Sequence, residues 1–383
     1  MQVTSENQLC LFETNKTRMN PFKIWLFNVR TCDIEELFKF KLNKINEFLS
    51  EEEKEIFCQR VCDYYHEVVG FPYYGEEINF LEELDRLKNS NVKKMLLENN
   101  ELQQIMSGLN ICNSFHPHMW DVKCRNQKTP KEVFLNKELF KGAIRKRLNM
   151  SDSKLKIFNV RKSLKIFSGA QSVSNFKPTV ARYMYETYCA VGSTVLDPCM
   201  GYGGRLLGSI ISSTVHAYHG VDPCVKTYNG NCRLDGELNK THNDKIFVEL
   251  NNRHDNRFFN VPFEDFTTTM SYDFIFTSPP YFDLEKYSDE PTQSYLRYPQ
   301  YEKWVQGFLQ PLIQKSYAYL KKGKYFAINV HGKKLIKEIK QLCEAEGFIL
   351  EDTLYMRLSR TPGKGINRIN TKFKKEPIFI WRK

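Results

Sequence analysis

Short apolar runs alternate with amphipathic segments through the second half of the chain. The runs are rich in β-branched and aromatic residues, as strands are, and they lie at Ser193–Asp197, Tyr218–Asp222, Val261–Phe266, Tyr272–Phe276, Tyr325–Val330, Gly347–Leu350 and Pro377–Trp381. Helical periodicity separates several of them, at Thr179–Tyr188, Glu302–Leu320 and Lys333–Ala345. This alternation predicts an α/β fold with a doubly wound, mainly parallel sheet.

The first of these strands leads into a glycine-rich turn. Residues 198–205 read PCMGYGGR, and a helical segment follows them. Glycines let the backbone approach a ligand closely, so a strand, a glycine turn and a helix together predict a nucleotide-type site. The spacing is not that of a dinucleotide fingerprint, and the lysine of a phosphate-binding loop is absent. Asp222 ends the next strand about 20 residues later, which suits a carboxylate that accepts hydrogen bonds from ribose hydroxyls.

The strand at Tyr272–Phe276 stops at two prolines, in the sequence TSPPY at 277–281. Proline cannot donate to a sheet ladder and fixes its own φ, so the chain leaves the sheet here in a stiff loop. The loop carries the hydroxyl of Ser278, the carbonyl of Pro279 and the aromatic ring of Tyr281. Because ligands bind at the carboxyl edge of open α/β sheets, we expect this loop to hold a flat ring that bears an amino group.

Composition and pattern divide the 383 residues into three parts. Residues 1–110 read as a mainly helical module, from the periodic runs at Asp33–Val69 and Asn79–Met106. Residues 111–167 form a basic connecting region, and residues 168–383 hold the strands.

Two basic regions account for much of the formal charge of +11. Between Asp121 and Lys165 there are fourteen Lys and Arg residues against four Asp and Glu residues, and Arg145, Lys146 and Arg147 are consecutive. The segment from Arg357 to Lys375 has seven Lys and Arg residues and no acid, and it includes Arg360, Lys364 and Arg368. Such clusters neutralise backbone phosphates, so these six residues are predicted nucleic-acid contacts. A solvated helix face is the alternative for the first region.

Cysteine usage and hydropathy predict the compartment. The eleven cysteines are odd in number and scattered, which favours a reducing compartment over a disulfide framework. Cys58, Cys62 and His66 share a helical face, but no second pair stands at zinc spacing, so no metal is predicted. The polar start and the lack of an apolar run near 20 residues predict a soluble, cytoplasmic protein without a membrane partner.

Three segments carry a resemblance to a known family. LDPCMGYGGR at 196–205, TSPPY at 277–281 and SNFKP with its helix at 174–188 resemble motifs of S-adenosylmethionine-dependent DNA amino-methyltransferases, which act on cytosine N4 or adenine N6. The resemblance covers residues 168–383 and implies a Rossmann-like methyltransferase fold with S-adenosylmethionine as cofactor. Cys199 stands where the family usually has Phe, and Tyr202 where it usually has a small residue. Little chain follows the last strand, so target recognition is expected from residues 1–165, from Arg357–Lys375, or from both.

The resemblance also implies roles for individual residues. Ser278 and the Pro279 carbonyl would hold the amino hydrogens, with Pro280 stiffening the loop and Tyr281 stacking on a base flipped out of double-stranded DNA. Asp197 would lie under the cofactor loop. Asp222 would accept hydrogen bonds from the ribose hydroxyls of the cofactor, and Glu264 or Asp265 would accept one from its adenine amino group. The remaining residues implied in the cofactor pocket are Phe176, Pro178, Pro198, Met200, Gly201 and Gly203.

Several functions stay open at this point. The resemblance implies cytosine N4 as the target, because the SPPY form of the loop is commoner among the cytosine-N4 members of the family and the DPPY form among the adenine-N6 members. Adenine N6 is the alternative, and an RNA base is a less favoured target. Carbon methylation needs a Pro-Cys nucleophile on the catalytic loop, whereas Pro198-Cys199 and Pro223-Cys224 follow the first two strands. A binding protein with a vestigial cofactor fold is disfavoured by intact Asp197, Asp222 and SPPY. A restriction-modification setting fits the resemblance, and the pattern does not define an oligomeric state.

Overall fold

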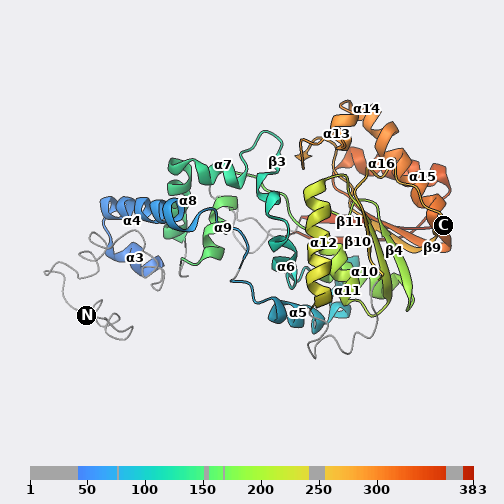
Figure 1. Ribbon diagram of the computed structural model, residues 1–383, viewed down its shortest axis with the longest axis horizontal. Coiled ribbons are helices and arrows are strands. Elements are labelled where there is room, and N and C mark those ends of the chain that lie inside the picture. Colours follow the sequence, from blue (N-terminus) through green and yellow to red (C-terminus); the bar gives the residue numbers. More distant parts are fainter. Residues whose placement is uncertain (1–41, 76, 151–154, 167–168, 241–254, 359–373) are drawn as a thin grey trace. The chain divides into compact units, whose positions relative to one another are not determined.

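The computed structural model describes residues 42–75, 77–150, 155–166, 169–240, 255–358 and 374–383 (Figure 1). The chain divides into two compact units, Met1–Tyr73 with Asn126–Ser172, and Tyr74–Arg125 with Val173–Lys383. Each unit therefore combines two separate stretches of sequence. This division differs from the boundaries at 110 and 167 drawn from the sequence, because residues 74–125 belong to the unit that contains the strands.

The first unit is helical where it is described. Its helices are α3 (Leu42–Phe48), α4 (Glu51–Tyr64), the π-helical turn Tyr65–Val69, α7 (Pro130–Leu135), α8 (Lys137–Met150) and α9 (Ile157–Ile166). Ser50 breaks the predicted run Asp33–Val69 by starting α4 with a capping box, in which Glu53 N donates to Ser50 Oγ (3.2 Å) and Ser50 N to Glu53 Oε2 (2.7 Å). Phe57, Val61 and Phe140 lie in the buried core between these helices. Residues 33–41 of that run lie outside the described residues.

The second unit is built on a nine-stranded sheet with the order β1-β2-β10-β11-β9-β7-β4-β5-β6. The central strands are parallel, and β11 alone runs antiparallel to both of its neighbours. The bounds are β1 Leu96–Leu97, β2 Glu101–Leu102, β4 Ser193–Asp197, β5 Val215–Val221, β6 Arg257–Phe259, β7 Tyr272–Thr277, β9 Leu320–Asn329, β10 Ile349–Arg357 and β11 Lys375–Arg382. This architecture confirms the predicted doubly wound α/β class.

Alternate residues of the central strands face two separate cores, as the period of a strand requires. Val195, Phe274 and Phe276 pack in one core with α10 (Pro178–Tyr188), α11 (Gly204–Ile211) and α12 (Val225–Lys240). Leu196 and Ile275 pack in the other with α14 (Tyr301–Trp304), the π-helical turn Val305–Leu309, α15 (Gln310–Tyr319) and α16 (Lys333–Glu346). Figure 1 shows the sheet between these two groups of helices.

Smaller elements complete the second unit. They are α5 (Phe80–Lys88), α6 (Leu109–Ser114), α13 (Ser294–Arg297), the 3-10 turns Val92–Met95, Glu98–Asn100 and Pro117–Asp121, and the two-stranded sheet of β3 (Lys123–Cys124) and β8 (Glu285–Lys286). None of the helices in the described residues has both the length and the apolar character required to cross a bilayer.

Two predicted elements were wrong in detail. The helical run Asn79–Met106 ends at Lys88, and its second half supplies β1 and β2, which extend the sheet because Glu101 and Leu102 pair with Tyr355 and Met356 of β10. The predicted strand Val261–Phe266 is a turn, and the strand itself is β6, just before it. In both places tertiary pairing decided between local patterns that were too short to be distinctive.

Candidate active site

A single cavity brings together the two loops singled out in the sequence. It lies at the carboxyl ends of β4, β5 and β7, and its walls include Pro198–Tyr202 after β4, Asp222–Cys224 after β5 and Ser278–Tyr281 after β7. Parallel strands present their carboxyl ends at one edge of the sheet, which is why segments about 80 residues apart meet here.

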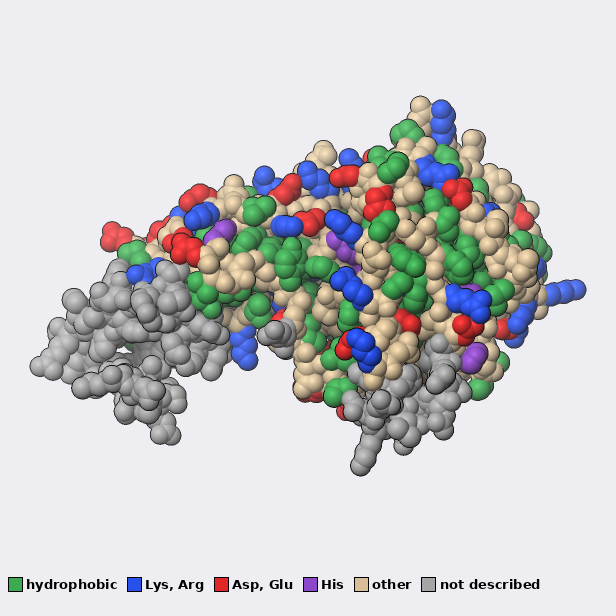
Figure 2. All heavy atoms as spheres, viewed as in Figure 1, with side chains coloured by type: hydrophobic (Ala, Val, Ile, Leu, Met, Phe, Trp, Pro, Cys, Tyr) green, Lys and Arg blue, Asp and Glu red, His purple; other side chains and the backbone are tan. Residues whose placement is uncertain are grey.

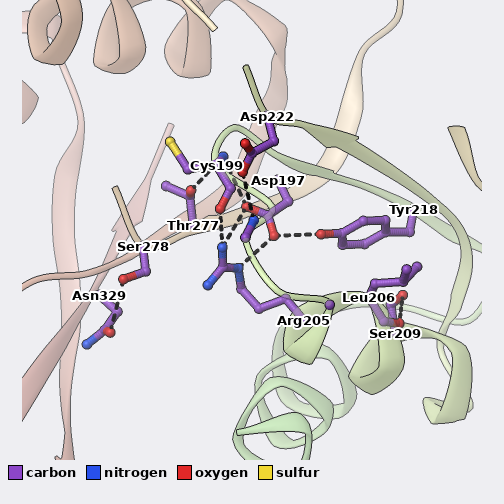
Figure 3. Close-up of polar contacts among 12 residues, drawn as sticks. Asp197, Cys199, Arg205, Leu206, Ser209, Tyr218, Asp222, Thr277, Ser278 and Asn329 are labelled. Carbon is purple, nitrogen blue, oxygen red and sulfur yellow. Dashed lines mark hydrogen bonds and ion pairs between the residues drawn. The ribbon is translucent and has the colours of Figure 1, made fainter. Parts of the chain in front are cut away.

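A buried ion pair holds the glycine loop. Arg205 Nε donates to Asp197 Oδ2 (2.6 Å) and Nη2 to Asp197 Oδ1 (3.2 Å), and the two side chains are 4% and 1% exposed (Figure 3). Arg205 also donates to the Cys199 carbonyl, and Tyr218 OH donates to Asp197 Oδ2 (2.6 Å). Cys199 N is shared between Asp197 Oδ1 (3.2 Å) and Thr277 Oγ1 (3.1 Å), which ties the loop to the end of β7. Asp197 therefore organises the loop from beneath.

Helix α11 begins at Gly204 because the backbone of residue 176 passes too close for a side chain. A Cβ atom on Gly204 would lie 2.0 Å from the Phe176 carbonyl oxygen, a distance that no side chain tolerates. The glycine thus lets α11 press against the segment 174–177, and Phe176 lies with its ring 5.3 Å from the Arg205 guanidinium carbon. Asn175 reinforces the contact by donating to the Tyr202 carbonyl (2.7 Å).

We expect Gly204→Ala to lower the free energy of unfolding by about 1–3 kcal/mol, the range typical of overpacking, and to weaken binding at the cavity because Phe176 must move. Gly236→Ala is the matched control, since Gly236 lies in α12 of the same unit and an added Cβ there meets nothing within 4 Å. Chemical denaturation of both variants checks this. Equal stability of the two would contradict the close-packing argument.

Asp222 reaches the cavity in the expected position at the end of β5. Its carboxylate accepts from Gly201 N (3.1 Å) and from Cys224 N (2.9 Å), which joins the ends of two strands. Burial raises the pKa of Asp222 to about 7, opposed by these two backbone hydrogen bonds. The side chain therefore changes charge near neutral pH.

The two acids predicted near the third strand are not equivalent. Glu264 lines the cavity and its side chain is 5% exposed, whereas Asp265 is 48% exposed and does not line it. Arg297 of α13 pairs with both, at 2.9 Å from Glu264 Oε1 and 2.8 Å from Asp265 Oδ2. Of the two, Glu264 is placed to meet a ligand.

The loop after β7 is held by partners far away in sequence. Ser278, Pro279, Pro280 and Tyr281 all line the cavity. Ser278 Oγ donates to Asn329 Oδ1 (3.4 Å) at the end of β9, as Figure 3 shows. Asn329 in turn donates from Nδ2 to the Pro377 carbonyl (3.0 Å). Strands β7, β9 and β11 together therefore set the position of the Ser278 hydroxyl.

Several cavity residues escaped the sequence interpretation. Each of them has a polar side chain and lines the same cavity as the Ser278–Tyr281 loop. They are Lys177, Glu285, Tyr287, Asn329 and Glu376. Tyr281 OH donates to Glu376 Oε1 (3.3 Å), and Tyr287 OH donates to Glu285. Burial raises the pKa values of Glu285 and Glu376. Lys177 belongs to the SNFKP motif and Asn329 lies in the predicted strand Tyr325–Val330, so both could have been considered from the sequence. No sequence motif marks Glu285 or Glu376 as part of a site.

Four predicted cofactor residues contact protein instead of lining the cavity, and one of them is Asp197, which pairs with Arg205 beneath the glycine loop. Pro178 is the buried first residue of α10, Gly203 packs near Leu234 and His116 with φ of 80°, and Asp265 is the exposed partner of Arg297. The cavity is lined by the other predicted cofactor residues, which are Phe176, Pro198, Met200, Gly201, Asp222 and Glu264. No cluster of His, Cys, Asp or Glu in the described residues has the arrangement of a metal site.

The predicted nucleic-acid residues are only partly described. Arg145 pairs with Glu51, and Arg147 is 7% exposed, with Nε donating to Ser163 Oγ (3.1 Å), so Arg147 serves the helical core. Arg360, Lys364 and Arg368 lie outside the described residues. Arg357 and Lys375, which flank that segment, both pair with Glu101 of β2. Figure 2 shows Lys and Arg side chains interspersed with acidic ones over the visible face, without a continuous basic patch in its described part.

Comparison with known proteins yields structures but no sequence relatives. No family model matches the sequence, and no curated protein matches it. Similar solved structures include TrmN from Thermus thermophilus, at 15% identity and TM-score 0.35, covering 54% of this chain and 48% of that one. A methyltransferase from Pyrococcus furiosus follows at 14% identity and TM-score 0.34, covering 53% and 82%. The N-methyltransferase NodS from Bradyrhizobium japonicum WM9, in complex with S-adenosyl-L-homocysteine, has 8% identity and TM-score 0.33, covering 54% and 84%.

The second unit of this chain is a Rossmann-like α/β structure by its own sheet order and crossovers. The chain spans about half the length of the TrmN structure that it matches.

Proposed function

We propose that this protein transfers a methyl group from S-adenosylmethionine to the exocyclic amino group of a base in double-stranded DNA, with cytosine N4 as the target. One observation carries the proposal. The glycine loop organised by Asp197 and Arg205 and the Ser278–Tyr281 loop line the same cavity, in the order and at the strand ends that the resemblance to amino-methyltransferases requires.

The cavity fits this cofactor on chemical grounds. Asp222 supplies carboxylate oxygens for ribose hydroxyls, and Glu264 supplies a further acceptor in the same cavity. Gln293 Nε2 also belongs to a cavity-lining residue and is buried without a hydrogen-bond partner among the described residues. A buried donor left unpaired is costly, so a ligand with ring nitrogens would satisfy it.

The cofactor, when bound, supplies an electrophilic methyl group on a sulfonium. This chain's own residues prepare the nucleophile. The lone pair of an exocyclic amino nitrogen is conjugated into its ring, so the nitrogen attacks poorly. Acceptors that hold the two amino hydrogens shift the nitrogen toward a geometry in which the lone pair points at the methyl group. The Ser278 side chain and the Pro279 carbonyl offer oxygen acceptors for those two hydrogens, and Asn329 holds Ser278 in place. Tyr281 offers a ring face against which the base stacks, so positioning provides most of the rate enhancement.

Two other targets compete, adenine N6 in DNA and a base amino group in RNA. The discriminating experiment incubates the purified protein and S-adenosylmethionine with unmodified duplex DNA or with structured RNA, then digests the polymer to nucleosides for mass spectrometry. We expect N4-methylcytosine from DNA. Formation of N6-methyladenine would instead identify adenine as the target, and product from RNA alone would identify RNA as the substrate. Failure to bind S-adenosylmethionine in calorimetry would overturn the proposal as a whole.

The pKa of Asp222 predicts how cofactor affinity depends on pH. A carboxylate accepts from two ribose hydroxyls, whereas the protonated group loses part of that capacity. With a pKa raised to about 7, Asp222 is ionised at pH 8 and mostly protonated at pH 6. We therefore expect S-adenosylmethionine affinity to fall about tenfold from pH 8 to pH 6, measured by calorimetry. Asp222→Asn should bind more weakly at pH 8 and lose this dependence. A persistent dependence in Asp222→Asn would assign the titration to another group.

A further inference from the structure

Lys177 of the SNFKP segment has a charged side chain that the proposed mechanism leaves without a task. The residue is half-buried and lines the cavity that also contains Ser278, Tyr281 and Glu376. Within the described residues it makes one hydrogen bond, from Nζ to the Asn175 carbonyl (2.9 Å). An ammonium group has three donors, so two donors of Lys177 remain for whatever occupies the cavity.

The electrostatic surroundings indicate which half of the cavity Lys177 serves. Burial lowers the pKa of Lys177 to about 8, and the Glu376 carboxylate opposes that shift by favouring the charged form. Glu376 itself accepts the hydrogen bond from Tyr281 OH (3.3 Å) and lies 3.9 Å from His331 Nδ1. Glu376, whose charge favours the ammonium form of Lys177, is therefore hydrogen-bonded to the residue that would stack on the base. An acidic side chain beside that residue disfavours the carboxylate of a cofactor there and leaves Lys177 available to a neutral acceptor.

The two possible target bases differ in whether they offer such an acceptor. Two ring positions from its amino-bearing carbon, cytosine has the carbonyl oxygen O2, and adenine has a C–H group in the corresponding place. An ammonium donor gains a charge-assisted hydrogen bond from a carbonyl and is left unpaired opposite a C–H. A base that is flipped out and stacked on Tyr281 must present this edge to the walls of the cavity.

We propose that Lys177 donates a hydrogen bond to the ring carbonyl of the flipped base, and that this contact selects cytosine over adenine. The inference rests on the proposed function, since it concerns the target half of the same cavity. In this arrangement Glu376 is a positioning residue, because it keeps Lys177 charged and orients the Tyr281 hydroxyl. The Asn175 carbonyl holds the ammonium group at the cavity wall.

The test compares the full-length protein with Lys177→Met, which keeps the length of the side chain and removes the charge, and Lys177→Arg, which keeps the charge. Calorimetry with S-adenosyl-L-homocysteine measures cofactor affinity, and nucleoside mass spectrometry measures N4-methylcytosine and N6-methyladenine formed in duplex DNA. For Lys177→Met we expect kcat/KM for cytosine to fall about 10- to 100-fold, the size of one charge-assisted hydrogen bond, with the cofactor Kd changed less than about twofold. Lys177→Arg should recover part of the loss.

Three results would overturn the inference. A cofactor Kd that rises in step with the loss of activity would show that Lys177 binds the cofactor instead of the base. An unchanged kcat/KM in Lys177→Met would remove any role in recognition. N6-methyladenine as the product of the unsubstituted protein would contradict the selection for a carbonyl. Failure of the proposed function itself has a different signature, because the unsubstituted protein would then bind no S-adenosyl-L-homocysteine or transfer no methyl group to any base.

Discussion

Replacing Arg205 with methionine is expected to lower the free energy of unfolding by about 3–5 kcal/mol, since it leaves the Asp197 carboxylate buried without its cation. The Tyr218 hydroxyl still donates to Asp197, which places the expected loss toward the lower end of that range. Methionine fills a similar volume, so the loss reports the missing charge and hydrogen bonds more than a cavity. Urea denaturation followed by circular dichroism measures the change.

The same substitution should also disturb the glycine loop, because Arg205 donates to the Cys199 carbonyl within it. We therefore expect weaker S-adenosylmethionine binding in the fraction that remains folded. Arg382→Gln is the control, since Arg382 pairs with Glu351 at 3.0 Å but both side chains are more than 40% exposed. Exposed pairs contribute about 0–1 kcal/mol. Similar losses in the two variants would show that the buried pair does not organise the loop.

Tyr281→Ala should reduce methyl transfer about 10- to 100-fold while the Kd for S-adenosylmethionine stays within about twofold. Base–aromatic stacking contributes about 1–3 kcal/mol, and its loss also frees the base to rotate away from the Ser278 and Pro279 acceptors. Single-turnover transfer to DNA, with calorimetry for the cofactor, separates the two effects.

Tyr281→Phe is the matched variant, because it keeps the ring and removes the hydroxyl, which donates to Glu376 and also interacts with Ser278. We expect it to retain most of the activity. If the phenylalanine and alanine variants lose activity equally, the hydroxyl and not the ring is the important group, and the stacking role would be wrong. If alanine weakens cofactor binding as strongly as transfer, Tyr281 belongs to the cofactor pocket.

Local pattern was sufficient for the elements that carry the two loops. The strand Ser193–Asp197 was predicted with its observed bounds, and Tyr272–Phe276 extends by one residue to Thr277. Both strands have a β-branched or aromatic centre that is buried on two faces, and prolines follow both ends, which makes such runs distinctive. The predicted helix Thr179–Tyr188 likewise begins one residue earlier, at Pro178, which suits a first turn.

Pattern failed where a segment was short or its partner distant. Leu96–Leu97 and Glu101–Leu102 continue a helical periodicity in the sequence, yet they pair with each other, and Glu101–Leu102 pair with β10 as well. The basic triplet at 145–147 looked uniform in sequence, but Arg147 is turned into the helical core. Burial of a charged side chain depends on which helices pack together, and one helix's periodicity does not contain that information.

The sequence by itself determined the α/β class, the two loops at strand ends and the chemistry they suggest, because hydrophobic period, glycine and proline act through neighbours along the chain. The tertiary structure alone decided what surrounds the Ser278–Tyr281 loop. Asn329 from β9 holds Ser278, Glu376 from β11 accepts from Tyr281, and Lys177 before α10 lines the same cavity. These residues meet because parallel strands and their crossovers bring distant segments to one edge of the sheet. Sequence patterns extend only over neighbouring residues, so they do not predict this contact.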